Sequence, residues 1–225
     1  MQVLTNLVAF LTGTPVLIGL LLTALVLFLA ADWRVAVGAL LVQYILVVIA
    51  LTDYVRIELV VVRLLTGFLV TIILYLGAQH VRDVGRDPQA EEAGPHVLGL
   101  HLGWLAGPLG FPLRLLAALL AVLATIRVFG HYTLTIVPMS LALMAFWMAC
   151  LGLLGLVLSG HPLRVAVAVL TILAGFDLVF GTLDPSLAVV GFLCALDLVA
   201  ALGLSYLTTV HYLAGQGAGG GGSQP

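Results

Sequence analysis

The 225-residue sequence is short of charge and has no lysine at all. Charged residues make up 8% of the chain, hydrophobic residues make up 63%, and all eight basic residues are arginine. The formal net charge of −2 gives no basic surface of the kind that binds nucleic acid. So few charges also leave no room for a separate soluble domain beside the apolar part of the chain.

Cysteine and catalytic motifs are equally scarce. Cys150 and Cys194 are the two cysteines, and both lie inside apolar runs, where a cysteine acts as a small buried hydrophobic residue. The chain has no phosphate-binding glycine loop, nucleophile elbow, HExxH zinc site or Ser/His/Asp set. Haem held between helices uses histidines inside the spans. Five histidines instead fall on the predicted cytoplasmic side, at the ends of runs or between them: His80, His96, His101, His161 and His211. We therefore expect no metal, no cofactor and no catalysis by the isolated chain.

Long apolar runs dominate what is present. A run of about 18 or more apolar residues can cross the roughly 30 Å hydrocarbon core of a bilayer. The sequence predicts an all-α, polytopic transmembrane bundle of about seven spans, or six if the fourth run does not cross. The predicted spans are residues 15–31, 35–52, 57–79, 113–129, 136–159, 163–183 and 187–213. The first run has no Lys or Arg before it, so we expect a retained helix and not a secretory signal.

These runs divide the chain into four parts. Residues 1–79 form an N-terminal three-helix unit, and residues 80–112 form a polar loop followed by an interfacial or re-entrant segment. Residues 113–213 form a four-helix unit, and residues 214–225 are a glycine-rich tail expected to be disordered.

The arginines predict the orientation, because short cytoplasmic loops accumulate positive charge. With seven spans, five arginines share the side that we take as cytoplasmic: Arg34, Arg82, Arg86, Arg114 and Arg164. Arg56 and Arg127 lie on the other side. We expect an integral protein of a bacterial cytoplasmic membrane, with its N-terminus outside and its C-terminus in the cytoplasm.

A faint internal repeat links the two halves of the chain. Residues 34–37 and 164–167 share the sequence Arg-Val-Ala-Val, and Tyr75-Leu76 corresponds to Tyr206-Leu207. The pattern predicts two three-helix copies in the same orientation, with the fourth helix as the connector that keeps them parallel. The alternative is chance matching in a sequence rich in Leu, Val and Ala.

The rare charges inside the runs are the candidate site. At a rise of about 1.5 Å per residue, Arg63 and Asp177 lie about 9 Å from the same membrane face, and Asp197 lies about 15 Å from it. Grouped in one layer, an arginine and two carboxyl groups provide what a proton or cation path needs. Glu58, one residue inside its helix, is a further candidate for the path or a headgroup-level charge.

Structural roles remain open for the same residues. Arg63 pairing with Asp177 could serve helix orientation alone, or Arg63 could extend toward the headgroups. Gln43 and Tyr44 are polar groups in the middle of a span, and we expect them to form hydrogen bonds between helices.

The C-terminal half resembles the K-type subunit of respiratory complex I and, more closely, hydrogenase-4 component E membrane subunits. The resemblance rests on residues 163–165, 174–178, 184–186 and 195–198, which include Asp177 and Asp197. It implies that these two acids belong to a proton path between larger antiporter-like subunits. The chain departs from the family in having Asp where the family has Glu, and in a shorter spacing between the acids.

The sequence as a whole predicts an accessory membrane subunit of a redox-driven or antiporter-like complex that translocates protons or cations. Its expected partners are the lipid bilayer and other membrane subunits, antiporter-like or hydrogenase-like, in what could be an oxidoreductase complex. Two alternatives remain: a self-contained transporter of ions or small solutes, and a structural scaffold subunit.

Overall fold

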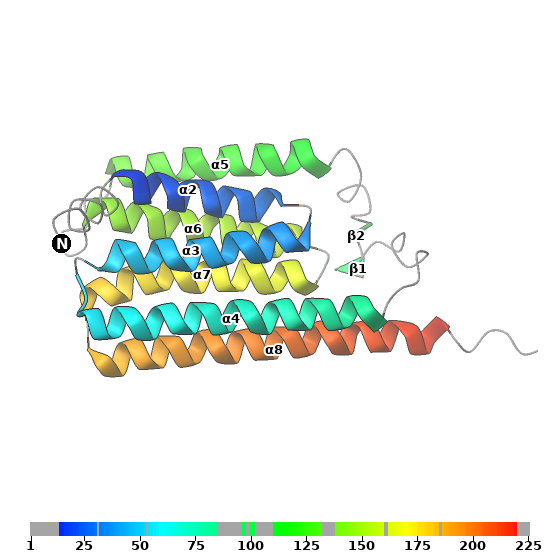
Figure 1. The fold of residues 1–225 in the computed structure, drawn as a ribbon. Coiled ribbons are helices and arrows are strands. Elements are labelled where there is room, and N and C mark those ends of the chain that lie inside the picture. Colours follow the sequence, from blue (N-terminus) through cyan, green and yellow to red (C-terminus); the bar gives the residue numbers. More distant parts are fainter. Residues whose placement is uncertain are drawn as a thin grey trace, which may run out of the picture.

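The protein is a bundle of long helices that lie side by side (Figure 1). The computed structural model describes residues 14–30, 32–52, 54–84, 96–97, 100–101, 110–131, 138–159, 162–184 and 186–219. Its elements are α2 (Thr14–Leu29), α3 (Trp33–Leu51), α4 (Ile57–Val84), β1 (His96–Val97), β2 (Leu100–His101), α5 (Gly110–His131), α6 (Met139–Leu158), α7 (Pro162–Leu183) and α8 (Leu187–Gly219).

Five of these helices are long and apolar enough to cross a membrane: α3, α6 and α7 in full, residues 57–79 of α4 and residues 187–210 of α8. Many large apolar side chains point outward from the bundle, among them Phe192, which is 68% exposed. An apolar exterior of this kind suits lipid and not water. The predicted membrane helix bundle is confirmed, and the chain is an integral membrane protein.

Two predicted spans differ from these five. Helix α2 has 16 residues and is about 24 Å long, shorter than the roughly 30 Å hydrocarbon core. Helix α5 has 22 residues but carries Arg114 and Arg127, and it is not among the five apolar spans.

The helices form two three-helix units that pack against each other. Helix α2 contacts α6, α3 contacts α7, and α4 contacts α8, while α5 lies at the edge beside α6 and α2 (Figure 1). A Cβ atom at Gly181 of α7 would meet Leu51 of α3, 130 positions earlier, and one at Gly77 of α4 would meet Ser205 of α8, 128 positions later. Each helix therefore runs beside its counterpart, in the same direction and nearly level with it, as the predicted parallel repeat requires.

The second unit is held together by a close contact between α6 and α7. A Cβ atom at Gly175 would lie 2.9 Å from the carbonyl oxygen of Ala145, and one at Gly152 would lie 2.9 Å from that of Ala168. Small residues let helix backbones approach in this way, which is how membrane helices gain packing contacts where lipid gives no hydrophobic drive. The approach fixes the position of α7, which carries Asp177.

Some boundaries differ from the sequence-based ones. Helix α4 continues to Val84, past the predicted end at Gln79, because residues 80–84 include no glycine or proline. Helix α8 continues to Gly219, although disorder was predicted from position 214, since glycines inside a helix weaken it without ending it. Residues 96–97 and 100–101 of the predicted interfacial segment pair as antiparallel strands. Residues 1–13 and most of the loop lie outside the described residues.

Candidate functional site: a buried charge cluster

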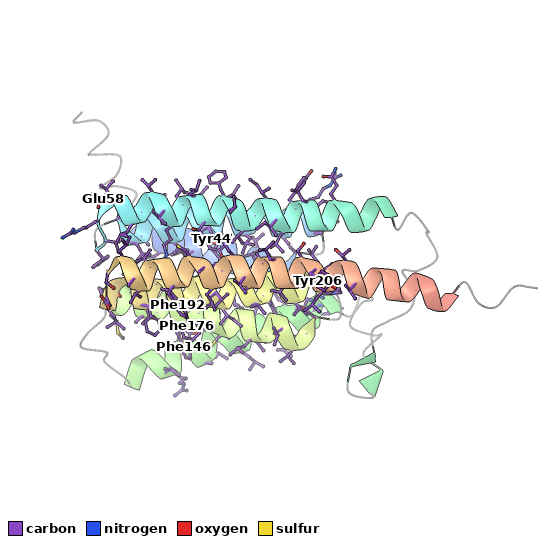
Figure 2. The ribbon with its side chains drawn as sticks, turned by 90° about the horizontal axis from the view of Figure 1, so that it is seen from below. Tyr44, Glu58, Phe146, Phe176, Phe192 and Tyr206 are labelled. Carbon is purple, nitrogen blue, oxygen red and sulfur yellow. The ribbon has the colours of Figure 1, made fainter. Side chains whose placement is uncertain are left out.

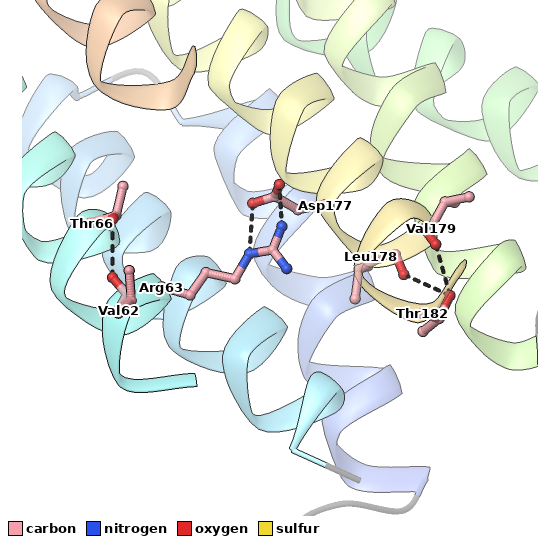
Figure 3. A network of polar contacts seen from close by, with 7 residues as sticks. All are labelled: Val62, Arg63, Thr66, Asp177, Leu178, Val179 and Thr182. Atoms are coloured by element: carbon pink, nitrogen blue, oxygen red, sulfur yellow. Dashed lines mark hydrogen bonds and ion pairs between the residues drawn. The ribbon is translucent and has the colours of Figure 1, made fainter. Parts of the chain in front are cut away.

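Arg63 and Asp177 form an ion pair inside the bundle. The guanidinium of Arg63, on α4, donates a hydrogen bond from Nε to Oδ2 of Asp177, on α7, at 3.1 Å, and its Nη2 contacts Oδ1 of the same carboxylate (Figure 3). Arg63 is 4% exposed and Asp177 is 2% exposed. A guanidinium that meets both oxygens of a carboxylate is the strongest geometry for such a pair. The predicted pairing of these residues is confirmed.

Helix α7 supplies the space for the guanidinium as well as its partner. Gly181 lies one turn after Asp177, and a Cβ atom at this position would be only 2.7 Å from Nη1 of Arg63. Leu51 of α3 borders the same spot. Nη1 itself has no hydrogen-bond partner among the described residues. Two of the three guanidinium nitrogens are thus directed at Asp177, and the third lies over a glycine.

Asp197 is the second buried carboxyl group. It is 3% exposed, and it lies on α8, which packs against both α4 and α7. Its carboxyl group is within electrostatic reach of Asp177 and Arg63, and it lies beside the hydroxyl group of Tyr44 on α3. The Tyr44 hydroxyl does not have the geometry of a hydrogen bond to any described residue. Four helices from both three-helix units therefore contribute to one cluster.

Tyr44 reaches the cluster because α4 has a glycine opposite it. A Cβ atom at Gly67 would lie 2.9 Å from Cβ of Tyr44 and 3.0 Å from the first ring carbon. The start of the Tyr44 side chain therefore lies close against α4 at Gly67, and Tyr44 is 2% exposed. Its neighbour Gln43 is fully buried, and neither atom of its amide group has a hydrogen-bond partner in the described part of the chain. The hydrogen bonds between helices that we expected for these two residues are not formed within that part.

The charges in this cluster do not balance. Arg63 contributes one positive charge, whereas Asp177 and Asp197 contribute two negative charges when both are ionised. An unpaired charge in a low-dielectric interior is costly, and the pair with Arg63 is already made by Asp177. Asp197 is therefore the group for which uptake of a positive charge is most favourable.

Glu58 is not part of the cluster. It is exposed in the first turn of α4 (Figure 2), where a carboxylate interacts favourably with the N-terminal end of the helix dipole. Figure 2 places Glu58 at the end of the bundle and Tyr44 in its middle. A role for Glu58 in an ion path stays a prediction without a contact to the other three residues.

Sequence reasoning missed two residues of the site. Gly181 lies four positions after Asp177 and therefore one turn away on the same face, but its contact with Arg63 depends on the position of α4. Tyr44 was noted as a polar group, but its partner could not be known without the lateral arrangement of the helices. Among the described residues, no group of three His, Cys, Asp or Glu side chains is arranged to hold a metal ion.

Comparison with known proteins adds no further assignment: no family model, curated protein or solved structure matches this chain.

Proposed function

We propose that the protein is a membrane subunit that moves protons across the bilayer, with Asp197 as the group that takes up and releases them. The observation that carries the proposal is a buried carboxyl group without a cation of its own, next to an Arg–Asp pair that is already complete. Ionisable groups at such depth are costly, and they mark ion and proton pathways in membrane proteins.

The geometry suggests how the site would work. The Arg63 guanidinium meets both oxygens of Asp177 and so stabilises its ionised form. Asp197 changes between a neutral carboxyl group and a carboxylate, and the Arg63 guanidinium moderates the cost of the charged form. The Tyr44 hydroxyl beside Asp197 can donate to the carboxylate or accept from the neutral acid. One proton bound at Asp197 removes the excess negative charge of the cluster.

The neighbours of Asp197 favour a proton over a metal cation. Hard metal ions such as Ca²⁺ take roughly six to eight oxygen ligands. The oxygen-bearing groups that interact electrostatically with Asp197 are the Tyr44 hydroxyl and the Asp177 carboxylate, and Asp177 is engaged by Arg63. The guanidinium would also repel a second cation at close range.

The resemblance to hydrogenase-4 component E subunits supports an accessory role in a larger complex, redox-driven or antiporter-like. In that setting Asp177 and Asp197 would join the proton path of antiporter-like or hydrogenase-like partner subunits. Exposed apolar side chains on α4 and α8 would lie against lipid or against such subunits.

A second candidate function is a self-contained transporter. The observation that favours it is the position of the cluster: Arg63 and Tyr44 come from the first three-helix unit, and the two aspartates come from the second. Transporters with parallel repeats commonly bind their substrate between the repeats, near the bilayer midplane. A transporter would move protons alone in liposomes, whereas an accessory subunit would need its partners.

The test replaces Asp197 with Asn, which keeps size and removes titration, and with Glu, which retains it. Proton uptake is measured in vesicles that contain the native complex, and in liposomes that contain the chain alone, together with the amount of assembled protein. We expect Asp197→Asn to assemble normally and lose most uptake, and Asp197→Glu to keep part of it. The matched control is Asp184→Asn, because Asp184 lies at a turn outside the helices, where Oδ1 accepts from the Ser186 backbone amide.

If the Asp197→Asn protein assembles normally and takes up protons at the wild-type rate, the proposal is contradicted. The cluster would then serve only to orient the helices, and the protein would be a membrane scaffold.

A further inference from the structure

The middle of α3 presents polar atoms that the protein itself does not satisfy. Gln43 is 0% exposed and Tyr44 is 2% exposed. The amide nitrogen and oxygen of Gln43, the Tyr44 hydroxyl and Nη1 of Arg63 have no hydrogen-bond partner among the described residues. Buried polar groups are nearly always paired, since an unpaired one loses its bonds to water and gains nothing in exchange. Unpaired atoms on Gln43 and Tyr44, two successive residues of one helix, depart from this rule.

Other buried polar side chains of the bundle behave differently. The hydroxyl groups of Thr71, Thr125 and Thr171 are also buried, but each donates to a backbone carbonyl group of its own helix at 2.8 Å. The unsatisfied atoms are therefore not a general property of the interior. Those of Tyr44 and Arg63 belong to the charge cluster, and those of Gln43 belong to the residue next to Tyr44.

The axial positions place Gln43 and Tyr44 level with Asp197. Tyr44 packs on Gly67 of α4, and Cys194 of α8 lies beside Thr66 of α4. Asp197 is three residues after Cys194 on α8, so it lies about 4.5 Å beyond the axial level of Thr66. This position is close to the axial level of Gly67, which follows Thr66 on α4. The Tyr44 hydroxyl and the Asp197 carboxyl group are in fact neighbours.

We propose that Gln43 and Tyr44 bind ordered water inside the bundle, and that this water carries protons to and from Asp197. A buried water typically makes about three hydrogen bonds to otherwise unsatisfied groups. Gln43 offers two donors and an acceptor, and Tyr44 offers a donor and an acceptor. Such a set can bind a water molecule in either orientation.

Proton transfer through this site is balanced in both directions. A protonated water gives one proton to a carboxylate oxygen of Asp197, which leaves neutral water and a neutral carboxyl group. The reverse step returns the proton to water and restores the carboxylate. The binding of water does not depend on the proposed function, but the transfer of protons to Asp197 rests on it.

The test compares Gln43→Leu and Tyr44→Phe with Thr125→Val, a matched control that removes a buried hydroxyl group already satisfied within its own helix. Gln43→Met preserves side-chain length and replaces Gln43→Leu if that variant does not fold. Infrared difference spectra between acidic and alkaline pH are recorded for the full chain in liposomes, in H₂¹⁶O and in H₂¹⁸O. Proton flux is measured in vesicles that contain the native complex.

We expect the wild type to show water bands that shift in H₂¹⁸O, and a carboxyl band that is absent from Asp197→Asn. The two α3 variants should lose the water bands and slow the proton flux about tenfold or more, whereas Thr125→Val should behave as the wild type. Unchanged water bands or unchanged flux in both α3 variants would overturn the water site and leave the proposed function standing. Absence of the Asp197 carboxyl band from the wild type would instead refute the proposed function, and the water bands would still decide the water site.

Discussion

The ion pair between Arg63 and Asp177 gives the sharpest test of the energetics. Asp177→Asn keeps the size of the side chain but removes its charge, and it leaves the Arg63 guanidinium buried at 4% exposure without the carboxylate that contacts it. Removing one member of a buried pair typically costs about 3–5 kcal/mol. We expect a loss of stability in this range, and a similar loss for Arg63→Leu, which leaves the Asp177 carboxylate unpaired.

The double variant separates this account from a simple loss of contacts. When both residues become leucine, both charges of the ion pair are removed and Asp197 can remain as a neutral carboxyl group. Apolar replacements of buried pairs are often neutral or even stabilising. We therefore expect the double variant to be much more stable than either single variant. Losses that add up in the double variant would refute the reasoning, because each residue would then contribute through its own packing.

The assay is reversible unfolding of the full chain in mixed micelles, followed by circular dichroism as the denaturing detergent is increased. Asp184→Asn is the control, since Asp184 lies in an exposed turn. The free energy of unfolding of this variant should be within about 0.5 kcal/mol of the wild-type value, as is usual for surface substitutions.

Two further predictions follow from the structure and the sequence. Gly181→Ala should destabilise the protein by about 1–3 kcal/mol in the same unfolding assay, since its Cβ atom would lie 2.7 Å from Nη1 of Arg63. Gly203→Ala on α8, where nothing lies within 4 Å, should be neutral or stabilise by up to about 1 kcal/mol, and equal losses for both variants would contradict a specific role for Gly181. A cysteine introduced by Gln89→Cys should react with a membrane-impermeant reagent from the cytoplasmic side, as the arginine distribution predicts. Labelling only from the outer side would reverse the proposed orientation.

The existence of the helices was predictable because the length of an apolar run can be counted directly in the sequence. Their lateral arrangement was not, since these helices are apolar nearly all round and the sequence does not mark which face is buried. Lipid-facing Phe192 and buried Leu193, for example, are equally apolar neighbours. The internal repeat was the one sequence feature that indicated how the helices would be arranged.

The same distinction applies to the site. Arg63 and Asp177 were paired correctly because depth follows from counting residues along a helix, and their depths matched. Gly67 and Gly181 carry no chemical group, so their part in placing Tyr44 and Arg63 became visible only with the neighbouring helix in position. Glu58 is acidic like Asp177 and Asp197, but it lies at the end of α4 and not at the depth of the cluster.

The position of the ion pair in the chain has a consequence for how the protein is made. Arg63 and Asp177 are 114 residues apart, so at about 5–20 residues per second the ribosome needs roughly 6–23 s to produce the carboxylate after the guanidinium. During that interval α4 has no acidic partner from α7, and an arginine within a span costs about 2.5–3.5 kcal/mol on insertion scales. Helix α4 can enter the membrane first, because its other residues in the span are mostly apolar, but it then carries a guanidinium without its carboxylate. The ion pair therefore forms only when α7 of the second three-helix unit is in place.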